Sequence, residues 1–457
     1  MCPSISALLS PSRGASTHPL APLLSSLGIE MVNCAQNLDI VQAKFWQNFL
    51  LRNLKVASEI EIAIPRGTRR EDFHQKLQKL FQPTKDYHRF GEYGVYDVVV
   101  EHCGIEIQVI GTVPYYPFLL AQYNKIFSVL SSVGARTKAT CGLHFHFLCE
   151  TLLDPLPSII MENFWNLIRF FAPELKYITS AGERPRGICR RRNHNSHLEL
   201  VKWETGEISL QQIQEFLRKS PQVPEHQNFL NLQHLVFNHK GAISNLHFEL
   251  RFLDADLCPA SLVAKIFLCL SLLLCAIEIS QLGRAKCGDS QLWEKKTSIL
   301  DRLSNNDGTL AESDTSSLTS DDFQFLKEKT EQMLNFLRIV LISFPQNPSL
   351  RVLEFLKENP LSFLRARGWS WQNIARVLAQ LGKPENREIE IESKLEELIN
   401  FSEITGCSSE EIWKKLACGL LNLTPDQLER TLFRLARLKR IAWNQEQGSY
   451  LFLNEES

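Results

Sequence analysis

Two histidines in the run Cys-Gly-Leu-His-Phe-His-Phe, residues 141–147, carry the clearest chemical signal in this sequence. Side chains alternate between two faces along a β-strand, so His144 and His146 point the same way, roughly 7 Å apart. The leucine and phenylalanines around them would enter the opposite, apolar face. Two imidazoles on one face can hold a metal ion or a phosphate, although the polar side of an ordinary solvent-facing strand shows the same pattern.

Three other segments repeat this arrangement of two polar groups in alternation with apolar residues. The four pairs are Glu59 with Glu61, Glu106 with Gln108, His144 with His146, and Glu249 with Arg251. One such pair is equally consistent with a solvated edge strand. Four pairs, each backed by apolar residues, predict instead a single sheet with a polar face that forms a site.

The chemistry of these side chains favours a magnesium and nucleotide site. Hard divalent ions such as Mg²⁺ prefer carboxylate oxygens and are commonly bridged to substrate phosphates. The acidic candidates for such ligands are Glu59, Glu61, Glu106 and Glu249. Arg251 suits a phosphoryl group in transfer. Only the spacing of His144 and His146 supports zinc, so a zinc hydrolase centred on them is a separate hypothesis.

The elements that must position these residues follow from hydrophobic periodicity. Helices are predicted over residues 39–55, 70–82, 118–133 and 158–171, and strands over 58–64, 95–100, 104–110, 141–147, 197–203 and 243–253. Strands and helices alternate without a regular βαβ rhythm, which favours an α+β domain with a largely antiparallel sheet. The apolar run Leu262–Ile279 holds only twelve uncharged residues between Lys265 and Glu278. Spanning a bilayer takes about 20, so the run predicts a buried helix.

Composition limits the classes of protein to consider. The 457 residues predict two or three domains. With 50 basic and 51 acidic residues, the chain has no global field for nucleic acid or an anionic membrane. Twelve cysteines without a Cys-x-x-Cys pair argue against a disulfide framework and a zinc ribbon, which favours a reducing cytoplasm. Ser, Pro and Gly interrupt residues 3–25, so no secretory signal is predicted.

Composition also divides the chain. The expected parts are a disordered leader at 1–38, a catalytic domain at 39–300, a polar linker at 301–324, and a helical C-terminal domain at 325–457.

The C-terminal part resembles helix-turn-helix and winged-helix modules over 361–384 and 408–453, with a hairpin expected around Gln447. Its last helix places Arg430, Arg434 and Arg437 on one face. Basic amphipathic helices also bind proteins, so docking of a peptide or protein is favoured over nucleic acid.

The order of motifs resembles a known family. Glu-Ile-Glu-Ile is followed by Gly-Ile-Glu-Ile, Cys-Gly-Leu-His-Phe-His, Asn-Leu and Phe-Glu-Leu-Arg before an apolar helix, over residues 56–280. This order is similar to the amidoligase family, carboxylate-amine ligases related to glutamine synthetase and glutamate-cysteine ligase. The resemblance implies a glutamine synthetase-like curved antiparallel sheet with flanking helices, whose concave face binds ATP and Mg²⁺.

The resemblance also implies roles for single residues. The expected metal ligands are Glu59, Glu61, Glu106, His144 and Glu249; the catalytic residues are Arg251, His144 and His146; and the nucleotide contacts are Asn231, Arg251 and Arg190. Arg190 belongs to the basic loop 184–192, a candidate clamp for phosphate or an acidic substrate, although a solvated loop is as plausible. Asp97 matches a further acidic position of the family.

The reaction implied is formation of an amide from a carboxylate and an amine through an acyl phosphate, with a peptide or protein among the candidate substrates. Two departures from the family pattern lead to an alternative. His226-Gln227 stands where relatives carry Arg-Tyr, and Ala255-Asp256 where they carry Gly-Thr. The alternative is a degenerate, ligase-like regulatory protein whose C-terminal helices bind a partner or nucleic acid.

Overall fold

The computed structural model describes most of residues 18–181 and 230–384, with gaps that include 85–93 and 306–318, and short segments between 390 and 452. The predicted strand at 197–203 lies outside the described residues. So does most of the predicted basic helix that carries Arg430, Arg434 and Arg437.

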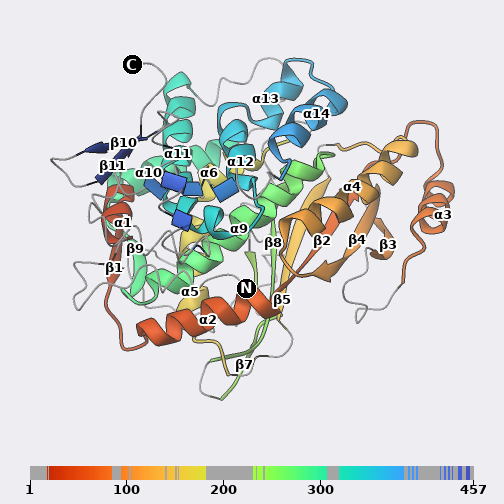
Figure 1. Cartoon of the computed structure of the whole chain (residues 1–457). Coiled ribbons are helices and arrows are strands. Elements are labelled where there is room, and N and C mark those ends of the chain that lie inside the picture. The colour runs from red at the N-terminus through yellow and green to blue at the C-terminus, as the bar shows by residue number, and fades with distance from the viewer. Residues whose placement is uncertain are drawn as a thin grey trace.

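Seven of the described strands form one large sheet whose neighbours all pair antiparallel (Figure 1). Its order is β3-β4-β2-β5-β8-β6, and β7 also pairs with β8. The strands are β2 (Lys55–Ile62), β3 (Val95–Glu101), β4 (Gly104–Thr112), β5 (Gly142–Cys149), β6 (Leu230–Asn231), β7 (Val236–Phe237) and β8 (Ile243–Asp254). The predicted α+β class with an antiparallel sheet and flanking helices is confirmed.

Helices cover the apolar face of this sheet. Helices α3 (Arg70–Phe81), α4 (Tyr116–Ser132), α5 (Ser158–Phe170) and α6 (Ala172–Thr179) contact its strands, whereas α2 (Ile40–Asn53) packs against the apolar helix at 259–279. The hydroxyl groups of Ser58 on β2 and Tyr123 on α4 are 2.8 Å apart. The rings of Phe248 on β8 and Phe164 on α5 have centroids 5.1 Å apart. Helices α4 and α5 therefore pack against the side of the sheet that faces away from the histidines.

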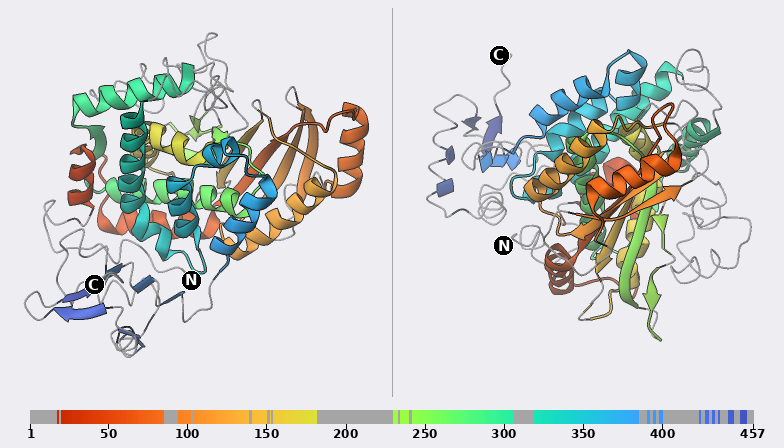
Figure 2. Two further views of the ribbon diagram at one scale, coloured as in Figure 1. Left: turned by 90° about the horizontal axis from the view of Figure 1, so that it is seen from above. Right: turned by 90° about the vertical axis from the view of Figure 1, so that its right-hand side faces the viewer.

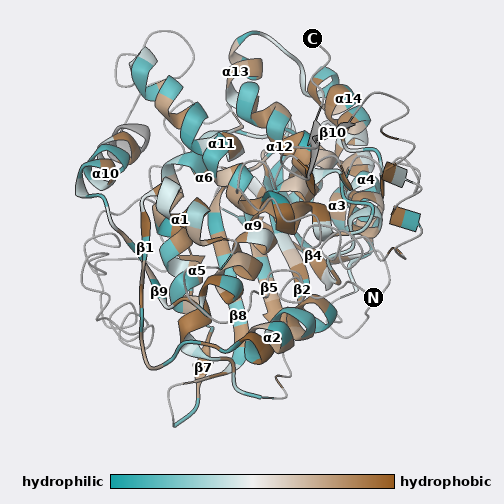
Figure 3. Ribbon diagram, turned by 60° about the vertical axis from the view of Figure 1, so that its left-hand side comes forward, coloured by the Kyte–Doolittle hydropathy of each residue, from teal (hydrophilic) through white to brown (hydrophobic). Residues whose placement is uncertain are grey.

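The long helix α9 (Pro259–Ile279) lies at the centre of the molecule (Figure 3). Its brown colour in that figure marks it as apolar. Within the described residues it is the one helix that is long and apolar enough to cross a membrane, but its most apolar 18-residue window is 100% buried in the protein. The predicted buried helix is confirmed. Its Lys265 reaches Asp256 at 2.5 Å, with both side chains fully buried.

The N-terminal region differs from the expected disordered leader. Residues 21–27 form α1 (Ala21–Leu27), and β1 (Ile29–Val32) pairs antiparallel with β9 (Arg284–Cys287). Leu20, Leu24 and Leu27 recur at helical spacing and are buried in the main core. The expected disorder was wrong for residues 20–27. Their leucines fall on one helical face, and packing of that face against the core holds the helix in place.

The C-terminal helices share the core of the sheet region. They are α10 (Ser290–Asn305), α11 (Ser320–Ser343), α12 (Ser349–Glu358), α13 (Leu361–Ala366) and α14 (Trp371–Leu381), and Figure 2 shows α11 to α14 gathered on one side of the molecule. The rings of Phe344, which ends α11, and Phe267 on α9 are 4.9 Å apart. Helices α10 and α11 occupy both ends of the expected linker at 301–324. The predicted hairpin is present as β10 (Ile441–Asn444) paired with β11 (Ser449–Phe452).

Candidate active site

The register of the sheet brings the predicted polar pairs together on one face. Directly opposite residues of antiparallel strands share a face. Glu59 lies opposite His144 on one side and Gln108 on the other. His146 lies opposite Glu249. Two further pairs extend the same face: Glu61 with Glu106, and Asn231 with Glu249.

A β-bulge interrupts the ladder between β5 and β8 at the first histidine. Leu143 pairs with Leu253 and Phe145 pairs with Leu250, so His144 alone faces the two residues between them on β8. A bulge of this kind bends the strand and redirects a side chain. Arg251 is one of those two residues, and the bulge therefore sets its position relative to His144.

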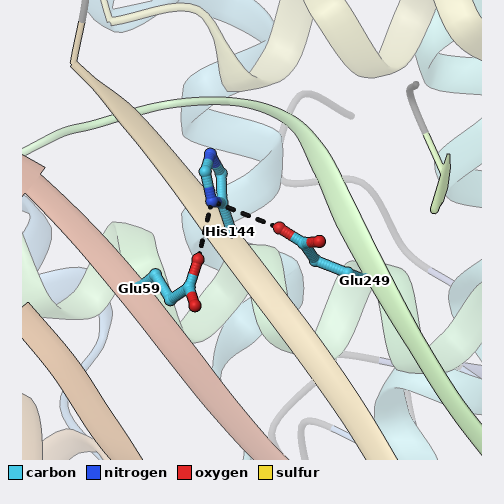
Figure 4. Close-up of side chains that lie close together, drawn as sticks. All are labelled: Glu59, His144 and Glu249. Atoms are coloured by element: carbon cyan, nitrogen blue, oxygen red, sulfur yellow. Dashed lines mark hydrogen bonds and ion pairs between the residues drawn. The ribbon is translucent and has the colours of Figure 1, made fainter. Parts of the chain in front are cut away.

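His144 is the centre of the site. Its Nδ1 lies 3.0 Å from Oε2 of Glu59 and 3.2 Å from Oε1 of Glu249, as the dashed lines in Figure 4 mark. Its Nε2 lies 3.7 Å from Oε1 of Glu61. The His144 side chain is 1% exposed. Strands β2 and β8 thus place three carboxylates around one buried imidazole on β5.

His146 adds a second layer to the same site. Its Nε2 lies 3.3 Å from Oε1 of Glu59 and 3.9 Å from Oε1 of Glu249. Its Nδ1 lies 3.2 Å from Nε2 of His247, whose ring stacks on exposed His234 with centroids 4.6 Å apart. A row of imidazoles therefore leads from the site to the surface.

Sequence reasoning did not single out His247 or His234. His247 precedes Glu249 by two residues on β8, so the same-face argument was sufficient to find it. His234 lies in a turn just before β7, where no periodicity places a side chain.

Two groups of side chains have the geometry to hold a divalent ion. One is Glu59, His144 and Glu249, and the other is Glu61, Glu106 and His144; in each, the ligand atoms lie within 4.8 Å of one another. Glu249, Glu106 and Glu61 are buried, at 2%, 6% and 9% exposed. Gathering several buried carboxylates is costly unless cations accompany them. This donor set fits a hard cation such as Mg²⁺.

The pKa of Glu106 shows how strongly the site resists negative charge. Burial, followed by the negative charge of Glu59, raises this pKa from 4.5 to about 8. Gln108 donates a hydrogen bond from Nε2 to Oε1 of Glu106 at 2.9 Å, which opposes the shift. A cation bound here would favour the ionised carboxylate.

The histidines have the opposite effect on Glu59. Burial alone raises its pKa, but hydrogen bonds from His144 and His146 outweigh burial and hold the pKa well below the usual range. Burial lowers the pKa of His146, but its hydrogen bond to Glu59 and the negative charges of Glu59 and Glu249 together outweigh burial, and the pKa is raised. Burial and the charge of His146 lower the pKa of His247 to about 4. His146 and Glu59 therefore form an ion pair, whereas His247 is neutral.

Arg251 and Asn231 both contact Glu249. Arg251 donates from Nη1 to Oε1 at 2.6 Å, and Asn231 donates from Nδ2 to Oε2 at 3.2 Å. Burial raises the pKa of Glu249, but His144 and Arg251 outweigh it and the pKa is lowered. Asp97 lies opposite Gln108, at the β3 end of the row that contains Glu59. Arg190 and the whole basic loop lie outside the described residues.

One departure from the amidoligase pattern has a structural role. Asp256 accepts hydrogen bonds from Ser261 Oγ and the backbone of Cys258, each at 2.9 Å, and pairs with Lys265. The carboxylate therefore fixes the start of α9 and does not face the site. The other departure, His226-Gln227, lies outside the described residues.

Comparison with solved structures finds a likeness at low similarity. The chain aligns with the crystal structure of the complex between Prokaryotic Ubiquitin-like Protein Pup and its Ligase PafA. The alignment covers 88% of this chain and 87% of that chain, with a TM-score of 0.32 and 10% sequence identity. No protein-family model matches this chain, and no curated protein matches it.

Proposed function

We propose that this protein is an ATP- and Mg²⁺-dependent ligase that joins a carboxylate to an amine through an acyl phosphate. The convergence of four strands' polar pairs around His144 is the observation that supports it most directly. If these residues were scattered over separate surfaces, the ligase hypothesis would have no site. The resemblance to amidoligases in the order of the motifs supports the same reaction class.

Each group of side chains would have a distinct part in this reaction. Glu59, Glu61, Glu106 and Glu249, with His144, would hold divalent cations. When bound, Mg²⁺-ATP would supply the phosphoryl group and neutralise charge on its oxygens. Arg251 would stabilise the negative charge of the phosphoryl group in transfer. His146, held in an ion pair with Glu59, would position that carboxylate or contact phosphate.

The chemistry requires two substrates besides ATP. A carboxylate oxygen attacks the γ-phosphorus and ADP leaves; the amine nitrogen then attacks the acyl carbon, phosphate leaves, and the nitrogen loses a proton. We propose a peptide or protein as one of the two substrates. We also propose a cytoplasmic location, consistent with the free cysteines among the described residues.

The test begins with nucleotide binding. Titration calorimetry of the full chain with ATP or a non-hydrolysable analogue, with and without Mg²⁺, is expected to show binding that depends on Mg²⁺. Glu249→Gln and Arg251→Ala are the site variants. Glu71→Gln and Arg70→Ala, at exposed positions on α3, remove the same charges away from the site and serve as controls.

Catalysis is tested by release of ADP and phosphate on mixing with panels of acids and amines. Suppose that the protein binds nucleotide, that no acid and amine in the panels cause release of ADP, and that the site variants bind nucleotide as well as the native chain does. This result would favour the degenerate, regulatory alternative. Absence of nucleotide binding at millimolar Mg²⁺ would contradict both the cofactor and the reaction.

A further inference from the structure

A stretch of the C-terminal helices outside the candidate active site carries basic residues without acidic ones. Residues 359–384 contain no acidic residue, although the whole chain has 51. The same stretch contains four basic residues, Arg365, Arg367, Arg376 and Lys383. The stretch itself therefore carries a net positive charge, and along the chain it lies between Glu358 and Glu385.

The backbone of this stretch has the order of a helix-turn-helix, with two helices joined by a short turn. Helices α13 and α14 are joined by residues 367–370, and Gly368 adopts a φ of +84° that favours glycine. The turn is closed by a hydrogen bond from the amide of Trp369 to the carbonyl of Leu364, at 3.0 Å. Ser370 Oγ then accepts a hydrogen bond from the amide of Asn373 and caps α14. A short turn that contains glycine is typical of this motif.

The inner side of the motif is anchored to the rest of the fold. Ile374 and Leu378 on α14 are fully buried. At the end of α14, the carbonyl of Gly382 accepts a hydrogen bond from Tyr116 Oη at 2.9 Å. A Cβ on Gly382 would lie 2.7 Å from Cβ of Ala260, so the chain there is closely packed against α9. These contacts hold one side of α14 against the core, so the opposite side faces outward.

The outer side of α14 presents polar residues in its first half. Gln372, Asn373 and Arg376 are exposed, and exposed Arg367 and Lys383 flank them. Asn and Gln pair with adenine in the major groove of DNA, and Arg pairs with guanine. In a helix-turn-helix protein, residues at the N-terminal end of the second helix contact the base edges. In Figure 3, α13 and α14 lie at the periphery of the molecule.

We propose that α13 and α14 form a binding site for double-stranded DNA, with α14 in the major groove. Gln372, Asn373 and Arg376 contact base edges, and Arg367 and Lys383 contact phosphates. The complementary charge and the polar character of the exposed side favour DNA over a protein, since a helix partner needs apolar anchors at i, i+3 and i+7. A-form RNA is disfavoured because its major groove is too narrow for a helix.

The test uses the full chain and a fluorescently labelled DNA duplex of mixed sequence. Anisotropy at low salt is expected to show saturable binding that weakens steeply as salt rises. In the phosphate-contact variant, Arg367→Ala with Lys383→Ala, the slope of log K against log salt is expected to fall by about 2, roughly one per lost contact. Lys76→Ala with Lys79→Ala removes two exposed charges from α3 and is expected to leave the slope unchanged.

Sequence selection separates base contacts from charge alone. After enrichment of a preferred duplex from a random library, Gln372→Ala with Asn373→Ala is expected to lower the preference for it at least about tenfold. No binding at low salt, an equal slope change in the α3 control, or equally tight binding of a matched RNA duplex would overturn the proposal. All substitutions are at exposed positions, and unchanged melting temperatures would show that the variants fold.

Discussion

Nη1 of Arg251 lies 2.6 Å from Oε1 of Glu249, a residue two positions earlier on the same strand. The Glu249 side chain is 3% exposed, so this guanidinium contacts a buried carboxylate of the site. The two residues share one face of β8 because they are two positions apart. Glu249 is also a member of one of the two groups suited to a divalent ion. A divalent ion bound by that group would therefore compete with the guanidinium for this oxygen, or share it.

The first prediction concerns Glu249 itself. Glu249→Gln keeps the shape of the side chain and one of its two acceptor oxygens but removes the charge that attracts a divalent ion. We expect the affinity for Mg²⁺-nucleotide to fall at least about tenfold, which is the lower end of the loss seen even for residues that only support a metal ligand. Titration calorimetry measures it, with Glu71→Gln as the matched control; equal affinities in the two variants would contradict the role of Glu249.

The second prediction separates binding of the metal from catalysis at Arg251. Arg251→Ala removes a competing cation from Glu249, so we expect Mg²⁺ to bind at least as tightly as in the native chain. The rate of phosphoryl transfer is expected to fall by about 10²–10³, the usual effect of losing one group that stabilises the transition state. A parallel loss of metal affinity and rate would show that Arg251 supports the structure of the site instead.

The third prediction concerns pH and the metal-free protein. Because the folded-state pKa of Glu106 is about 8, above the reference value of 4.5, its stabilising contribution is complete below pH 4.5 and is lost as pH rises through 8. We expect the melting temperature of the metal-free protein to fall as pH rises from about 5 to about 8, with no further loss from this group above pH 8. In Glu106→Gln this part of the decrease should be absent, and a decrease of the same size in both proteins would assign it to other groups.

The fourth prediction tests the buried pair of Lys265 and Asp256. Lys265→Met leaves the Asp256 carboxylate buried without its cation, and breaking such pairs costs about 3–5 kcal/mol. Urea unfolding is expected to show this loss. Adding Asp256→Leu should recover part of it, because an apolar pair needs no compensating charge. A double variant that is less stable than the single one would show that the hydrogen bonds of Asp256 to Ser261 and Cys258 contribute more than the pair.

Period-two alternation was enough to predict which residues share the polar face. It placed Glu59, Glu61, His144 and His146 correctly, because every second residue of a strand points the same way. The bulge at His144 could not be predicted, since it depends on the register between β5 and β8, about 100 residues apart in the chain. The pairing of β1 with β9 was missed for the same reason: short strands far apart in sequence give no local signal.

His144 belongs to both groups of candidate metal ligands, one on each ring nitrogen. A neutral imidazole has one lone pair, because its other nitrogen carries a proton. The ring can therefore ligate only one ion at a time, and two ions cannot both be completed by protein atoms from these groups. Oxygens of a phosphate are the natural substitute, which would make arrival of the second ion depend on the nucleotide. Which nitrogen of His144 carries the proton would then decide which of the two groups binds an ion first.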